Sequence, residues 1–297
     1  MADPVTYKDS ITMKTIFITG ATSGIGLIVA SELVSYGDKV IATARNTESA
    51  DKLIGYYKKH YPGGAGIIEI ILCDLSSFES IVHACDQIID NNERIDVLIN
   101  NAGLWNFSYR ESHNKIEETL QVNVLAPLLI SHLLLSLLLK SKDSKIIFAA
   151  SALHQGRVDL SNLEFKNGFS GFKAYRQSKL EIILLCRLLA RKLESNNVGV
   201  YCEHPGLVNT MLGRDAGWFS NLFFRLMGIS PAKGAKTILF LTQEDKSNLV
   251  SGEYYYKNAI KRISGYSYDM QVADSLLQKL KIYLEDFIKP MSLIFQK

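Results

Sequence analysis

The stretch Thr19-Gly20-Ala21-Thr22-Ser23-Gly24-Ile25-Gly26 joins a short β-rich run to an amphipathic helical run with no breaker between them. Glycines at such a junction let the backbone turn sharply and approach a ligand closely. The exposed N–H groups at the start of the following helix favour a pyrophosphate. The spacing Gly-x-x-x-Gly-x-Gly differs from the generic dinucleotide fingerprint Gly-x-Gly-x-x-Gly, so an ordinary glycine-rich turn is the alternative interpretation.

Short β-rich runs alternate with helix-length runs from Lys14 onward, which predicts an α/β fold with a parallel sheet and helices on both faces. The predicted strands cover residues 15–19, 39–44, 67–72, 97–100, 145–150, 198–203 and 253–256. The predicted helices cover residues 24–36, 48–60, 77–91, 114–139, 175–194 and 232–241, with a C-terminal helix over about 270–288.

A single domain is the expectation for this chain, since 297 residues with 47% hydrophobic content can bury one large core. No repeat or Pro/Ser-rich linker divides it. We therefore assign residues 1–12 to an N-terminal lead-in and residues 13–297 to one dinucleotide-binding and catalytic domain.

Charge and cysteine patterns argue against several classes of protein. The 33 basic and 30 acidic residues are spread along the chain, without the basic stripe that nucleic-acid binding needs. The four cysteines lack zinc-site spacing, and the N-terminal residues lack the features of a signal peptide. The apolar run 124–139 is too short for a membrane span and reads as a buried or interface helix. We expect a cytoplasmic protein, with peripheral membrane contact as the alternative.

Residues at the ends of the second, third and fourth predicted strands indicate which dinucleotide binds. An NAD enzyme usually carries a carboxylate after the second strand, whereas this chain has Ala44 followed by Arg45. A cation there suits a 2′-phosphate, so NADP(H) is the expected cofactor and NAD(H) the alternative, unless Arg45 is only a solvated surface charge. Further candidate contacts follow the third strand (Asp74, Leu75) and the fourth (Asn101, Ala102, Gly103). The Asp74 carboxylate could accept from the adenine amino group.

The segment Tyr175-Arg176-Gln177-Ser178-Lys179 places a phenol and an ammonium one helical turn apart on the same face. With 14 tyrosines in the chain, about one such pair is expected by chance. Ser151, at the end of the fifth strand, and Asn123, within an apolar helical run, complete a candidate catalytic set. Taken singly, Ser151 could be an ordinary strand-end hydroxyl and Asn123 a satisfied polar group in a helix.

Reduction of a carbonyl by hydride needs these residue types, because the developing alkoxide must be hydrogen-bonded and then protonated. For Tyr175 to act as a base near pH 7, its pKa must fall by about three units from about 10. The Lys179 ammonium and the positive charge of an oxidised nicotinamide are the available causes. Ser151 would orient the substrate oxygen, and Asn123 would hold a water connecting Lys179 to solvent.

These residues together resemble the classical short-chain dehydrogenase/reductase family over roughly residues 14–278. The resemblance also includes Pro205-Gly206-x-Val208-x-Thr210. It implies a Rossmann-type, doubly wound seven-stranded parallel sheet of order 3-2-1-4-5-6-7 and a proton relay through Tyr175, Lys179, the cofactor ribose and Asn123. It places Val208 and Thr210 near the carboxamide end of the nicotinamide and counts Pro205 and Gly206 among the cofactor contacts.

Within that family the chain looks most like retinol dehydrogenase-like and other carbonyl-reducing members. The cues are Arg45-Asn46, Ser151-Ala152-Leu153-His154, His204-Pro205-Gly206 and Ser251-Gly252-x-Tyr254. Two departures are Ala150, where many such members carry a second serine, and Asn123-Val124-Leu125-Ala126, where Asn-His-Leu-Gly is commoner.

An apolar segment at about residues 211–230 resembles the part of family members that closes over the substrate. It contains Trp218, Phe219, Leu222, Phe223, Phe224, Leu226 and Met227. We therefore expect a lipophilic ketone or aldehyde, or the corresponding alcohol, as substrate. Simple packing, or contact with a membrane or partner, is the alternative role of this segment. The resemblance also suggests a homodimer formed through the long helices.

Two other functions compete with a carbonyl-reducing enzyme. A non-catalytic NADP(H)-binding regulator would carry a broken acid/base set, whereas this set is intact. A sugar-nucleotide epimerase or dehydratase would also use a Tyr/Lys pair, but such enzymes usually carry Gly-x-x-Gly-x-x-Gly and a longer C-terminal domain.

Overall fold

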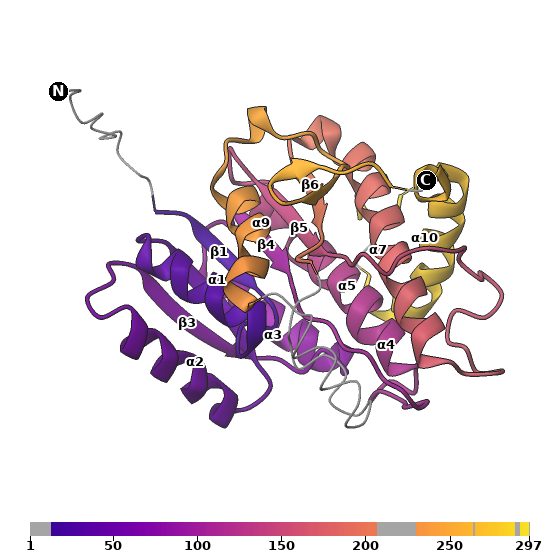
Figure 1. Cartoon of the computed structure of the whole chain (residues 1–297), viewed down its shortest axis with the longest axis horizontal. Helices are drawn as coiled ribbons and strands as arrows, with labels where there is room; N and C mark the ends of the chain where they lie inside the picture. Colours follow the sequence, from indigo (N-terminus) through magenta and orange to yellow (C-terminus); the bar gives the residue numbers. More distant parts are fainter. Residues whose placement is uncertain (1–12, 207–229, 264, 289–291, 297) are drawn as a thin grey trace.

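The strands lie in one eight-stranded sheet in a computed structural model that describes residues 13–206, 230–263, 265–288 and 292–296 (Figure 1). Their order is β3-β2-β1-β4-β5-β6-β7-β8. β1 to β7 pair in parallel, and β8 pairs antiparallel with β7. The strands are β1 (Thr15–Ile18), β2 (Lys39–Ala44), β3 (Ile67–Leu72), β4 (Val97–Asn100), β5 (Lys145–Ala149), β6 (Gly199–Glu203), β7 (Tyr254–Tyr256) and β8 (Ala259–Ile260).

This arrangement confirms the predicted doubly wound sheet and its order for β1 to β7. The sequence did not predict β8, which has only two residues. Lys257 and Asn258 connect it to β7 with φ values of 51° and 62°. Positive φ at both central residues is the geometry of a tight hairpin turn, so β8 exists because the chain reverses directly after β7.

Helices cover both faces of the sheet and bury two apolar clusters. One cluster joins the sheet to α1, α2 and α9, and the other joins it to α3, α5, α6, α7 and α10. The α-helices are α1 (Gly24–Ser35), α2 (Thr47–His60), α3 (Phe78–Asn91), α4 (Glu118–Leu120), α5 (Ala126–Leu133), α6 (Leu135–Leu138), α7 (Gly171–Lys192), α9 (Pro231–Gln243) and α10 (Met270–Leu284). The remaining helical turns are η1 (Gln121–Leu125), η2 (Glu194–Asn196), η4 (Lys246–Asn248), η5 (Gly265–Tyr268) and η6 (Glu285–Phe287).

The predicted continuous helix over 114–139 is wrong, because the structure divides this region into α4, the π-helix η1, α5 and α6. The helical region begins only at Glu118, for two reasons. Lys115 has a φ of 61°, which is not helical, and the Glu117 carboxylate caps the helix by accepting from the N–H groups of Thr119 and Leu120. Pro127, which has no N–H to donate, comes just after the π-helix η1, where the regular hydrogen-bond ladder is already interrupted. Most of the apolar run 124–139 is buried, as expected.

α7 begins at Gly171, four residues before Tyr175, so the predicted start at Tyr175 is also wrong. The Ser170 side chain caps this helix by accepting from the N–H of Lys173. Gly171 lies so close to the carbonyl of Asn106 that a Cβ would collide with it. Tyr175 and Lys179 therefore lie within the ordered first turns of α7. None of the helices that the structure describes has both the length and the apolar character needed to cross a bilayer.

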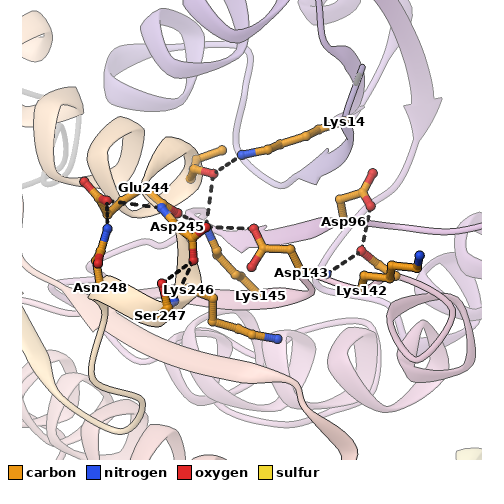
Figure 2. Close-up of polar contacts among 12 residues, drawn as sticks. Lys14, Asp96, Lys142, Asp143, Lys145, Glu244, Asp245, Lys246, Ser247 and Asn248 are labelled. Atoms are coloured by element: carbon orange, nitrogen blue, oxygen red, sulfur yellow. Dashed lines mark hydrogen bonds and ion pairs between the residues drawn. The ribbon is translucent and has the colours of Figure 1, made fainter. Parts of the chain in front are cut away.

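A buried lysine fixes the C-terminal end of α9 to the sheet, at the edge where the parallel strands begin (Figure 2). Lys145, the first residue of β5, donates from Nζ to the carbonyl oxygens of Glu244 and Thr242, and its ammonium lies 3.5 Å from the Asp143 carboxylate. Lys14 donates to the same Thr242 carbonyl at 3.0 Å. Two cations thus satisfy the terminal carbonyls of α9 and oppose the negative end of its dipole.

Lys145→Met is expected to destabilise the chain by about 1–3 kcal/mol, because the partly buried Glu244 carbonyl loses its donor and the Thr242 carbonyl keeps only Lys14, while the side chain has similar length. Urea denaturation followed by circular dichroism measures the change. Lys142→Met is the matched control, because Lys142 is exposed. Equal stability of the two variants would contradict the capping role of Lys145.

Candidate active site

A cavity of about 960 Å³ lies at the carboxyl ends of the parallel strands, where doubly wound sheets bind their ligands. Residues from the ends of β1 to β6 and from α7 form its wall. The predicted cofactor residues that line it are Gly20, Thr22, Ser23, Gly24, Ile25, Gly26, Arg45, Asp74, Leu75, Asn101, Ala102, Gly103, Tyr175, Lys179, Pro205 and Gly206. Val208, Thr210 and the expected lid, apart from Ser230, lie outside the described residues.

The glycine turn after β1 is held closely against the end of β4. Gly20 has a φ of +68°, and a Cβ at Gly26 would collide with the Gly20 carbonyl oxygen. Asn101 fixes this turn, because its Nδ2 donates to the carbonyls of Thr19 at 2.9 Å and Gly20 at 3.2 Å. The Thr19 hydroxyl in turn accepts from the backbone N–H groups of Asn101 and Ala102.

The start of α1 is suited to an anion. Among the described residues, no side chain caps this helix at Ser23, and its first turn contains no acidic residue. The first N–H groups therefore remain available on the wall of the cavity, in the positive end of the helix dipole. A glycine cradle without side chains, next to an uncapped helix start, fits the pyrophosphate of a dinucleotide.

Two charged residues flank the part of the cavity next to β2 and β3. Arg45 follows β2, is exposed and lines the cavity, while its neighbour Asn46 caps α2. Asp74 is oriented by Ser76, whose N–H and hydroxyl donate to Oδ1 at 2.9 and 2.8 Å. His113 Nε2 lies 3.6 Å from Asp74 Oδ2. Both predicted residues are thus at the cavity, with a cation placed at the end of β2.

Tyr175, Lys179 and Ser151 meet on the same wall of the cavity. Lys179 Nζ lies 5.7 Å from the centre of the Tyr175 ring and donates to the Ala149 carbonyl at 2.8 Å. Burial lowers the pKa of Lys179 to about 8, although the negative charge of Glu203 opposes this.

The pKa of Tyr175 differs from what the sequence reasoning required of a base. Burial raises this pKa, and the interaction with the Ser151 hydroxyl only partly offsets the rise. The chain alone therefore keeps the phenol protonated at neutral pH. A fall in this pKa needs positive charge beyond what the chain alone places beside Tyr175.

Asn123 lies in the π-helix η1, beside Lys179 but not on the cavity wall. Its amide is bound to the backbone of Leu104, accepting from the N–H at 2.8 Å and donating to the carbonyl at 2.9 Å, and it also donates to Ser178. A Cβ at Gly103 would lie 3.3 Å from both Asn123 Oδ1 and Lys179 Nζ. Asn123 and Lys179 thus flank Gly103, and a bound water between Asn123 and solvent stays a prediction.

The cavity-wall residues that sequence reasoning missed include Trp105 and Glu203. The Trp105 ring stacks on that of Tyr175, with centres 4.7 Å apart and an angle of 11°, and it also contacts Phe107 and Phe172. Trp105 comes two residues after Asn101-Ala102-Gly103, which is the signal that could have placed it. Glu203 ends a predicted strand, and nothing in the strand pattern distinguished its side chain.

The sheet order and the position of the cavity define a doubly wound α/β protein of the Rossmann type. The chain belongs to the short chain dehydrogenase family, whose sequence model matches residues 14–217. It is therefore an oxidoreductase of that family.

The similar proteins include several retinol dehydrogenases. Retinol dehydrogenase 14 of Homo sapiens is 34% identical over 264 residues, which cover 82% of this chain and 77% of that protein. Retinol dehydrogenase 13 of Homo sapiens is 33% identical, covering 84% and 77%. An uncharacterised protein of Mycobacterium paratuberculosis has a solved structure with a TM-score of 0.73 and 25% identity, covering 92% of this chain and 93% of that one. The predicted resemblance to retinol dehydrogenase-like members is confirmed.

Proposed function

We propose that this chain transfers hydride between NADP(H) and an apolar carbonyl compound or its alcohol, with Tyr175 as the acid/base. The observation that carries this proposal is that one cavity is lined both by Tyr175, Lys179 and Ser151 and by the glycine turn after β1. Family membership supports the reaction class, because the matching family model is that of the short chain dehydrogenases.

The residues at the carboxyl edge fit NADP(H). The uncapped start of α1 and the Gly20–Gly26 turn would hold the pyrophosphate, and Arg45 would bind the 2′-phosphate. Asp74 would accept from the adenine. When bound, the cofactor supplies or accepts the hydride.

Tyr175 supplies the proton in the reducing direction. Its raised pKa keeps the phenol protonated, which is the form that donates to a developing alkoxide. Ser151 would donate a hydrogen bond to the same substrate oxygen. Lys179, one turn further along α7, would resupply the proton, because its pKa of about 8 lies close to neutral pH.

The substrate side of the cavity is aromatic. Trp105 and Tyr175 both line the cavity and their rings stack, so an apolar group next to the carbonyl would pack on them. The printed names of the relatives are those of retinol dehydrogenases, which supports a lipophilic alcohol or aldehyde as the substrate class.

Tyr175→Phe is expected to lower kcat for carbonyl reduction about 10²–10⁴-fold, because it removes the donor and keeps the ring. The decrease in NADPH absorbance with a panel of apolar aldehydes and ketones measures turnover. Tyr36→Phe is the matched control, since Tyr36 is 52% exposed and lies outside the cavity wall. Near wild-type turnover by Tyr175→Phe would show that the acid/base assignment is wrong.

Arg45→Ala is expected to weaken NADPH binding about 10–100-fold and to change NADH binding little, because a charge-assisted contact to the 2′-phosphate is lost. Fluorescence titration with each nucleotide measures both affinities. Lys58→Ala, an exposed cation on the neighbouring helix α2, serves as the control. Equal losses for NADPH and NADH in Arg45→Ala would exclude the phosphate contact.

A further inference from the structure

Glu203 is a fully buried carboxylic acid at the edge of the cavity. It is the last residue of β6, its exposed fraction is 0%, and it contributes to the cavity wall. Among the described residues, neither of its carboxylate oxygens has a hydrogen-bond partner. Burying an unpaired carboxylate is costly, and a nearby positive charge would offset that cost.

The sheet register brings Glu203 next to the anchor of Lys179. Lys179 Nζ donates to the carbonyl of Ala149, and Ala149 is the register partner of Glu203 on the neighbouring strand. The backbone N–H of Ala150 also donates to the carbonyl of Glu203 at 2.7 Å. The Lys179 ammonium is thus held against the end of β5, next to the end of β6 that carries Glu203, and no hydrogen bond joins the two groups in the described residues.

The charged and titratable groups around this pair are few in the part of the chain that the structure describes. Lys179 on α7 is the positive group that acts on Glu203, and Glu203 is the negative group that acts on Lys179. Burial raises the pKa values of Tyr254 on β7 and Cys202 on β6, and the negative charge of Glu203 raises both further. Tyr175 faces Lys179 from the same helix. At neutral pH the Tyr254, Cys202 and Tyr175 groups carry no charge.

We propose that Glu203 is a positioning residue that supplies the negative charge needed to keep the Lys179 ammonium protonated inside the buried site. This inference rests on the proposed function, in which Lys179 resupplies the proton that Tyr175 delivers. Without that charge, burial would favour neutral Lys179, and the neutral amine has no proton to pass on.

The two pKa values show the direction of this coupling. Burial raises the pKa of Glu203 well above 4.5, and Lys179 lowers it. Burial lowers the pKa of Lys179 to about 8, and Glu203 raises it. Removing the Glu203 charge therefore leaves burial unopposed, so Lys179 loses its proton at a lower pH. The decline of carbonyl reduction on the alkaline side should then begin at a lower pH.

The first experiment compares pH–rate profiles of kcat for carbonyl reduction in the wild type, Glu203→Gln and Glu203→Asp. In Glu203→Gln, which keeps shape but not charge, the alkaline decline should shift by about one pH unit or more towards acid. That shift corresponds to a tenfold or larger loss of rate on the alkaline limb. Glu203→Asp, which keeps the charge, should restore most of the wild-type profile. A profile that is unchanged in Glu203→Gln overturns the proposal.

Glu181→Gln is the matched control. Glu181 is also fully buried with a raised pKa, but its partner is Gln177 and it does not line the cavity. Its substitution should leave the position of the alkaline decline unchanged. A shift equal to that in Glu203→Gln would show that any buried carboxyl group has this effect, and would overturn the specific role of Glu203.

The second experiment needs no turnover and so separates this inference from the proposed function. Infrared titration of the free protein follows the protonated-carboxyl band of Glu203, assigned by its loss in Glu203→Gln. In Lys179→Met this band should appear at a higher pH than in the wild type, because the positive neighbour is gone. If the band appears at the same pH in the wild type and in Lys179→Met, the proposal is overturned. If the wild type reduces no carbonyl but the band shifts, the charge coupling stands and the proposed function fails.

Discussion

The close contact between the glycine turn and the end of β4 is the constraint on which the site depends. Asn101 binds the carbonyls of Thr19 and Gly20, and Gly26 fits only because it has no side chain. This contact places the start of α1 at the cavity, and the N–H groups there remain uncapped among the described residues. Because the parallel strands all end at this edge, residues far apart in the chain reach the same cavity.

Burial at that edge determines the chemistry of the ionisable groups. It raises the pKa values of Tyr175 and Glu203 and lowers that of Lys179 to about 8. The three groups are thereby shifted towards their neutral forms, and each charge that remains depends on a neighbour. We infer that the site uses this dependence, with the Glu203 charge keeping Lys179 protonated and Lys179 resupplying the proton that Tyr175 delivers.

Lys145, at the opposite edge of the sheet, is also a buried lysine, but different groups offset the cost of burying its charge. Lys145 has a pKa lowered to about 8 by burial, yet it is held by the terminal carbonyls of α9 and by Asp143. Its role is to close the end of a helix against β5 (Figure 2). The same residue type thus serves packing at one edge of the sheet and, in our proposal, proton transfer at the other.

The sequence predicted the central sheet well because short apolar runs between turn residues allow few alternatives. The bounds of β2, β3 and β4 agree residue by residue with the prediction. The broken helix after Lys115 was missed because an apolar pattern does not show where Glu117 will cap or where a π-turn will form. The gathering of Tyr175, Lys179 and Ser151 followed from their places at strand and helix ends. The Tyr175 pKa and the role of Glu203 depend on burial and strand register, which local patterns do not contain.

We propose above all that hydride passes in this cavity from a bound nicotinamide to a carbonyl carbon. NADPH deuterated at C4 on the transferred face, incubated with an apolar aldehyde, tests it most directly by mass spectrometry of the alcohol. The account predicts one deuterium on the former carbonyl carbon, with the label absent when the other face of C4 is deuterated. Alcohol formed without deuterium from either labelled cofactor would contradict it, as would the absence of alcohol across the whole panel of carbonyl compounds.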